Sequence, residues 1–312
     1  MPYGVVMATG GAGEVAGLCG LHGIMAALTG VAVIQAILVA VHAVSVCGGI
    51  RVPRWRFGLF TIALGLAVIG GNLRSLAPVA GDVALGMAWL ATLALGCWRI
   101  VLLRWPAGRT ETVDGTWFLA PAALLGDALA TAAMAGARSG GAICLAVVAC
   151  LAGVAGYALV IAASGYRLRR RGLTGSPLAP WWISAGCGGL AAAACGEVAD
   201  RILATPLHRI LTDLVVTTWV AGTVLLIVVL AGCARYAWRR PRGPWAHIWT
   251  PVFSMAVYAA GTSRLARLSG TDLLKDFAVV TIAATLALWG INRALCFRNL
   301  TRHSRRRIQG SG

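Results

Sequence analysis

Acidic side chains are scarce in this 312-residue sequence, and so is charge of any kind. Asp and Glu number ten against 27 Lys and Arg, which gives a net charge of +17. Charged residues make up 12% of the chain, hydrophobic residues make up 59%, and the mean hydropathy is +0.80. A soluble domain could not bury so much apolar surface. The composition therefore predicts an integral membrane protein whose solvent is the lipid bilayer.

Patterns that carry catalytic or metal chemistry are also missing. The nine cysteines show no repeated CxxC spacing, and the five histidines form no HxxH or HExxH pair. Nearly all cysteines lie inside apolar runs, where they behave as small hydrophobic side chains. No Ser-His or paired-carboxylate arrangement occurs at helical spacing. We therefore expect no metal site, no cofactor and no enzymatic activity.

No single basic face exists, because the arginines occur in short clusters between apolar runs. This distribution indicates membrane topology and not nucleic-acid binding. The first twenty residues carry no Lys or Arg ahead of their apolar stretch, and they include Glu14. They are predicted to be a retained span and not a cleaved signal peptide.

Ten stretches free of strong charge predict an all-α protein with ten transmembrane helices. They cover residues 2–19, 24–50, 57–73, 83–103, 115–136, 141–165, 180–196, 209–234, 246–267 and 277–297. Residues 1–298 are interpreted as one transmembrane domain, and 299–312 as a basic cytoplasmic tail.

Arginine placement orients these spans. Of the 27 basic residues, 20 follow even-numbered spans and 7 follow odd-numbered ones. Cytoplasmic loops hold the excess of Lys and Arg, so both termini are predicted to face the cytoplasm across a cytoplasmic membrane. The run from Arg305 to Arg307 is expected to lie on anionic lipid.

Short spans rich in glycine alternate with longer aliphatic ones. The first, third, fifth and seventh spans are short, and glycines such as Gly10, Gly11, Gly65, Gly70 and Gly188 punctuate them. Missing side chains permit close helix packing or open a path between helices. The sequence leaves both interpretations open.

Four segments in order along the chain resemble the tellurite-resistance and dicarboxylate transporter family, which includes slow anion channels. These are PYGVVMATGGAGEVAG (2–17), GTWFLAPAALLGDALA (115–130), LAPWWISAGCGGLAAAACG (178–196) and HIWTPVFSMAVYAAGTSRLAR (247–267). The resemblance implies an inner ring of five odd-numbered helices around a pore, an outer ring of five even-numbered helices, and a homotrimer.

The same resemblance implies that a phenylalanine on the ninth helix closes the pore, and the matching residue is Phe253. The sequence departs from the family where Ser254 replaces the proline that follows this phenylalanine, with Pro251 two residues earlier. The third span also lacks a clear proline, and little precedes the first span. The candidates for pore-lining or hinge positions are Gly10, Gly11, Gly65, Gly70, Pro121, Gly188, Pro251 and Ser254.

A pathway for anions needs a positive electrostatic potential that attracts them but does not bind them tightly. Kinked helices whose N-terminal ends face a lumen would supply weak anion sites without a fixed charge. The cytoplasmic arginines would add a potential that concentrates anions at the inner mouth.

Two acidic residues on odd-numbered spans, Glu14 and Asp127, are candidates for coupling or for ion pairing with Arg264 or Arg74, because charge at membrane depth is costly. An alternative interpretation is that Glu14 lies near the outer lipid headgroups and is solvated there. Glu197, Asp200 and Asp213 are expected to lie solvated in an outer loop region.

These observations favour transport of small anions, of the chloride, nitrate or dicarboxylate kind, through a central pore gated by Phe253. A proton-coupled dicarboxylate carrier or an exporter of sulfite or tellurite oxyanions would use the same architecture. A membrane protein without a transport function is the further alternative. The expected partners are small anions, lipid and two further copies of the chain, but not nucleic acid.

Overall fold

The computed structural model describes residues 3–46, 59–102, 114–135, 139–171, 181–203, 205–239 and 249–309. Within these ranges the chain forms ten α-helices and one short 3-10 helix, and no strand. The elements are α1 (Tyr3–Leu18), α2 (His22–Val46), α3 (Phe60–Arg74), α4 (Pro78–Leu102), η3 (Gly115–Phe118), α5 (Leu119–Met134), α6 (Gly140–Arg171), α7 (Trp182–Arg201), α8 (Pro206–Arg239), α9 (Trp249–Ser269) and α10 (Asp272–Gln309). The all-helical prediction is confirmed, and each predicted span overlaps one helix.

Helix length alternates along the chain. The odd-numbered helices have 15 to 21 residues and the even-numbered ones have 25 to 38. At about 1.5 Å per residue, α1, α3 and α5 are roughly 22 to 24 Å long, which is shorter than a hydrocarbon core of about 30 Å. The even-numbered helices are all long enough to cross that core.

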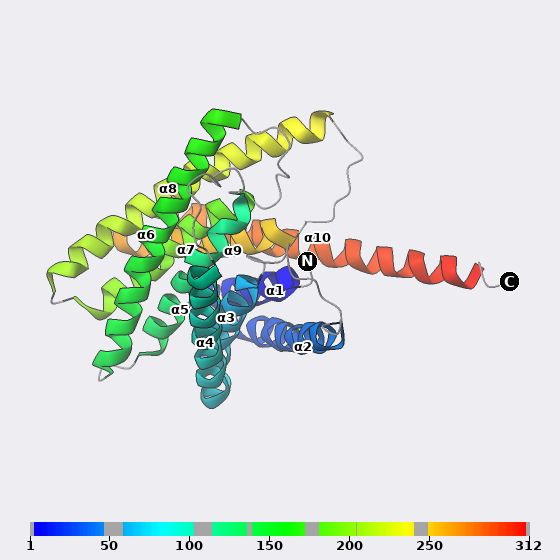
Figure 1. Ribbon diagram of the computed structural model, residues 1–312, viewed down its shortest axis with the longest axis horizontal. Coiled ribbons are helices and arrows are strands. Elements are labelled where there is room, and N and C mark those ends of the chain that lie inside the picture. The colour runs from blue at the N-terminus through cyan, green and yellow to red at the C-terminus, as the bar shows by residue number, and fades with distance from the viewer. Residues whose placement is uncertain are drawn as a thin grey trace.

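Several even-numbered helices extend past their predicted ends. The last span was expected to end at residue 297, but α10 continues to Gln309, through most of the predicted tail. Figure 1 shows this helix projecting beyond the rest of the bundle. The physical reason is that arginine ends an apolar run without ending a helix, and residues 298–309 contain neither proline nor glycine.

Six segments of the described chain are long and apolar enough to cross a membrane, and they comprise the five even-numbered helices and the segment containing α5. In the even-numbered segments 22% to 33% of the residues are buried, against 72% in the segment containing α5. Helices that face lipid need apolar surfaces, whereas helices enclosed by protein do not. The molecule is therefore a helical membrane protein in which the segment containing α5 is enclosed by protein, whereas the five even-numbered segments are largely exposed.

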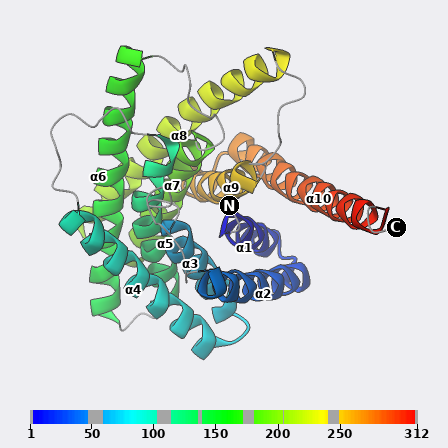
Figure 2. The same ribbon diagram turned by 45° about the vertical axis from the view of Figure 1, so that its right-hand side comes forward.

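Helix contacts follow a simple rule. Each even-numbered helix packs against the odd-numbered helix before it, which makes five successive helical hairpins. The odd-numbered helices also contact one another, in the order α1, α3, α5, α7, α9 and back to α1. Figure 2 shows α2, α4, α6, α8 and α10 on the outside of these five helices.

Glycines bring α7 and α9 into backbone contact. A Cβ atom at Gly186 would lie 2.7 Å from the Cα of Ser254, and one at Gly189 would lie 2.9 Å from the amide nitrogen of Tyr258. Only glycine permits such an approach. The glycines of α7 thus serve helix packing, and they fix the position of α9 relative to α7.

Arg293 of α10 joins three helices. Its guanidinium donates a hydrogen bond of 3.0 Å to the Thr9 hydroxyl of α1 and lies 5.2 and 5.3 Å from the ring centres of Trp249 and Trp289. These are cation–π distances. Arg293 thus connects α10 to the first halves of α1 and α9.

Candidate functional site

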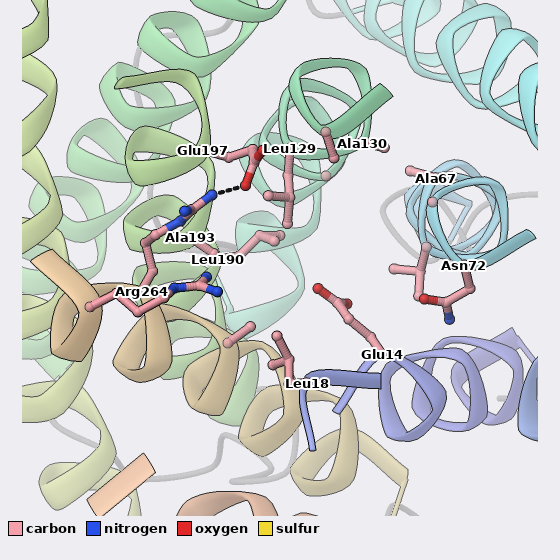
Figure 3. A pocket seen from close by; sticks show the side chains of 16 residues that line it. Glu14, Leu18, Ala67, Asn72, Leu129, Ala130, Leu190, Ala193, Glu197 and Arg264 are labelled. Atoms are coloured by element: carbon pink, nitrogen blue, oxygen red, sulfur yellow. Dashed lines mark ion pairs between the residues drawn. The ribbon is translucent and has the colours of Figure 1, made fainter. Parts of the chain in front are cut away.

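All five odd-numbered helices line one cavity of about 210 Å³. No even-numbered helix contributes to its lining within the described chain. The lining residues are Glu14 and Leu18 of α1, Ala67, Val68, Gly71 and Asn72 of α3, Gly126, Leu129, Ala130 and Ala133 of α5, Leu190, Ala193 and Glu197 of α7, and Ala260, Arg264 and Arg267 of α9. Figure 3 draws these side chains around the cavity and labels ten of them.

The cavity lies toward the C-terminal ends of the five helices. Its lining stops at Leu18, Asn72, Ala133, Glu197 and Arg267, each within four residues of the end of its helix. The arginine distribution predicts that these ends face outward. Most of the lining residues are apolar, and the polar groups that a ligand would meet come from Asn72 and from four charged residues, Glu14, Glu197, Arg264 and Arg267.

An ionic network connects α7, α9 and the end of α5 at the cavity. Arg264 forms ion pairs with Glu197 and with Asp200, the latter at 2.5 Å. Arg201 contacts Glu197 at 3.1 Å and donates hydrogen bonds to the carbonyl oxygens of Ala133 and Ala135. The two arginines and the two acids of this network together carry no net charge.

This network corrects the expectation that Glu197 and Asp200 lie solvated in a loop. Both belong to the last turns of α7, because that helix continues past its predicted end at residue 196 to Arg201. Asp213 is exposed, but it lies within α8 and not in a loop.

Glu14 reaches the cavity from α1. Its side chain is partly buried and points toward the middle of the cavity, with Arg264 and Glu197 beyond it (Figure 3). The two proposed partners are engaged elsewhere, since Arg264 pairs with α7 and Arg74 lies 3.9 Å from Asp82. Within the described residues Glu14 forms no ion pair.

Asp127, the other acidic candidate, is fully buried and does not line the cavity. It lies beside Thr92 of α4, and neither of its carboxylate oxygens has a hydrogen-bond partner in the described part of the chain. Burying an unpaired carboxylate is costly. This site is therefore suited to a carboxyl group that holds a proton.

Phe253, the predicted gate, is the fifth residue of α9 and is 2% exposed. A Cβ atom at Gly11 would lie 3.6 Å from the Cδ2 atom of Phe253. The ring shares a hydrophobic cluster with Met7, Leu64 and Leu190. Phe253 lies seven residues, or about 10 Å of helix, before Ala260, which lines the cavity. Packed side chains thus fill the interior on the N-terminal side of the cavity.

The other candidates for pore-lining or hinge positions lie at contacts between helices or in the first turns of α9. Gly10 and Gly65 lie at contacts between α1 and α3, whereas Gly70, Pro121 and Gly188 contact the outer helices α4, α6 and α8. Ser254 abuts Gly186 of α7, and its hydroxyl has no hydrogen-bond partner among the described residues. Pro251 lies half-buried in the first turn of α9. None of them lines the cavity.

Sequence reasoning missed most of the residues that line the cavity. On α5, Gly126, Leu129, Ala130 and Ala133 recur at helical spacing, and α7 and α9 show the same spacing. Residues three and four apart share one helix face. On α5 the periodicity of small apolar residues is the signal that could have identified the lining, whereas on α7 and α9 the lining positions include Leu190, Glu197, Arg264 and Arg267.

Comparison with protein-family models finds no matching family, and comparison with curated proteins finds no match. Within the described ranges, no group of three or more His, Cys, Asp and Glu side chains could hold a metal ion. The fold and the cavity define the class as a helical membrane protein whose inner helices share one cavity.

Proposed function

We propose that this protein passes small anions across the cytoplasmic membrane through a conduit enclosed by α1, α3, α5, α7 and α9. The observation that carries this proposal is the cavity, to which each of these five helices contributes and no described even-numbered helix does. The closed order of contacts among the same helices supports it, because a conduit needs a continuous wall.

Helix direction favours anions over cations at the inner mouth. All five inner helices begin at one end of the conduit, and a helix N-terminus carries about half a positive charge. Their C-terminal ends are negative, but Arg74, Arg201 and Arg267 occupy the last turns of α3, α7 and α9. This arrangement attracts anions from the cytoplasmic side without a deep binding site.

Phe253 is the proposed gate of this conduit. Its ring lies in the packed interior between the N-terminal ends and the cavity, with Gly11 opposite it. A hydrophobic constriction of this kind blocks ions because it excludes their water. Removing the ring should therefore open the path.

The test is anion flux in proteoliposomes. Phe253→Ala should raise chloride or nitrate flux about tenfold, which corresponds to about 1.4 kcal/mol of the barrier. The matched control is Phe118→Ala, since Phe118 is equally buried but packs against Tyr157 and Trp181, away from the cavity. An equal flux in wild type and folded Phe253→Ala would contradict the proposal, as would an equal increase in the control.

A proton-coupled carrier of dicarboxylates or oxyanions is the second candidate, and Asp127 is the observation that favours it. A buried carboxyl without a partner can take up and release a proton during a transport cycle. A proton gradient would then drive anion accumulation against its own gradient, which a channel cannot do. Measuring uptake with and without that gradient separates the two candidates.

A further inference from the structure

Glu14 is the one cavity acid that no ion pair engages among the described residues. We infer that its carboxyl group sets the charge of the cavity, so that protonation of Glu14 admits anions and its ionisation hinders them. This inference rests on the proposed function, because it assigns acid dependence and charge selectivity to the same conduit. It makes Glu14 a specificity-determining residue.

The charges lining the cavity support the inference. Two cations, Arg264 and Arg267, and two anions, Glu14 and Glu197, line it. With Glu14 ionised these charges sum to zero, and with Glu14 protonated they sum to +1. The adjacent Arg201 and Asp200 cancel one another and leave this balance unchanged. The occupancy of one proton thus decides whether the cavity is neutral or cationic.

The geometry leaves Glu14 available for that role. Arg264 lies across the cavity, but its two terminal nitrogens already contact Glu197 and Asp200. Arg267 is exposed at the end of α9. Figure 3 shows the Glu14 carboxyl group pointing into the space between α1 and α7. An anion that crosses the cavity would therefore pass this carboxyl group.

Other charged groups near this end of α1 are on the neighbouring helices. His22 begins α2, Arg74 ends α3 and contacts Asp82, and Arg264 and Arg267 lie on α9. At the start of α10, Asp272 pairs with Lys275 at 2.8 Å, and Asp276 follows. Of these groups only the two α9 arginines line the cavity with Glu14.

The sign of the pH effect follows directly. At low external pH Glu14 is protonated, the cavity carries +1 and anion flux is high. As pH rises Glu14 ionises, the cavity becomes neutral and flux falls. One unit charge at contact distance in water-like surroundings changes a rate about fivefold. We therefore expect about a fivefold fall in flux from acidic to alkaline external pH.

The experiment measures chloride flux into proteoliposomes at external pH values between 5 and 8, in a Phe253→Ala background. Glu14→Gln should keep flux high at every pH, while the background protein shows the fivefold fall. Asp127→Asn is the matched control, since it removes a buried acid outside the cavity, and it should keep the fall. Arg267→Gln changes only an exposed side chain and should lower flux about fivefold at acidic pH.

Different failures have different meanings. If neither the background protein nor wild type carries any anion, the proposed function fails and this inference fails with it. If the background protein carries anions and Glu14→Gln keeps the same pH dependence, only the inference on Glu14 is overturned. Should Glu14→Gln not fold, an Arg267→Gln variant with unchanged flux would overturn it in the same way.

Discussion

At the scale of single residues, Glu197 holds the C-terminal ends of three helices together. Its two carboxylate oxygens contact Arg264 of α9 and Arg201 of α7, and Arg201 also donates hydrogen bonds to two carbonyl oxygens at the end of α5. The Arg264 side chain is 10% exposed. A buried arginine depends on its acidic partners, because an unpaired buried charge is strongly destabilising.

Glu197→Ala should therefore lower stability by about 2 kcal/mol, the order expected for losing hydrogen bonds to a charged group. The measurement is the thermal denaturation midpoint in detergent. Asp82→Ala is the control, because its 3.9 Å pair with Arg74 joins side chains that are 63% and 40% exposed. Exposed pairs contribute little, so the control should change stability by less than about 0.5 kcal/mol. Equal effects of the two variants would refute the importance of the network.

This network could not be predicted from the sequence. Arg264 was expected to pair with Glu14 or Asp127, but its acidic partners are Glu197 and Asp200, which lie more than sixty residues earlier in the chain. The predicted end of α7 at residue 196 also placed Glu197 and Asp200 in a loop. The charged residues were used to place the end of the apolar span, but the helix itself continues through them to Arg201.

At the scale of helices, glycine determines how closely α7 and α9 approach. A Cβ atom at Gly189 would lie 2.9 Å from both the amide nitrogen of Tyr258 and the carbonyl oxygen of Val257, which are rigid backbone atoms. Neither atom can move without shifting α9 as a whole. The contact therefore tolerates no side chain.

Gly189→Ala should thus destabilise the protein by about 1 to 3 kcal/mol, the range for overpacking a filled interior. The control is Gly86→Ala on the exposed side of α4, where an added Cβ would meet nothing within 4 Å. Alanine favours a helix over glycine by about 1 kcal/mol, so the control should be neutral or stabilising. Thermal denaturation of both variants measures the difference. A stable Gly189→Ala protein would show that α7 and α9 lie farther apart.

The order, number and length alternation of the helices were predictable from the sequence. Runs of apolar residues identify α6 and α8, and glycine-bearing runs identify α1, α3 and α7. The role of each glycine was not predictable, because packing and lining require the same missing side chain. Gly70 and Gly188 were candidates for the pore, and they contact α4 and α8.

At the scale of the whole molecule, the sequence indicated a membrane protein but not which helices enclose the cavity. Length and hydropathy together select the outer helices, because α1 and α3 are apolar but too short to count as spans, and only the segment containing α5 among the inner ones qualifies. The proposed ring of odd-numbered helices came from the family resemblance and remains a proposal.

The claim that anions travel through the shared cavity is central to this account. Ala133 suits a direct test, because it lines the cavity at the end of α5 and is exposed. A thiol introduced there would react with charged reagents added from outside. Treating the protein without the Ala133→Cys substitution in the same way measures any effect of the native cysteines.

The deciding measurement is chloride flux through Ala133→Cys, in the Phe253→Ala background, before and after reaction with thiol reagents of equal size and opposite charge. The account predicts that the negative reagent lowers flux about fivefold, the effect of one unit charge near the ion path, and that the positive reagent does not lower it. Full modification by both reagents with no change in flux would contradict a path through this cavity.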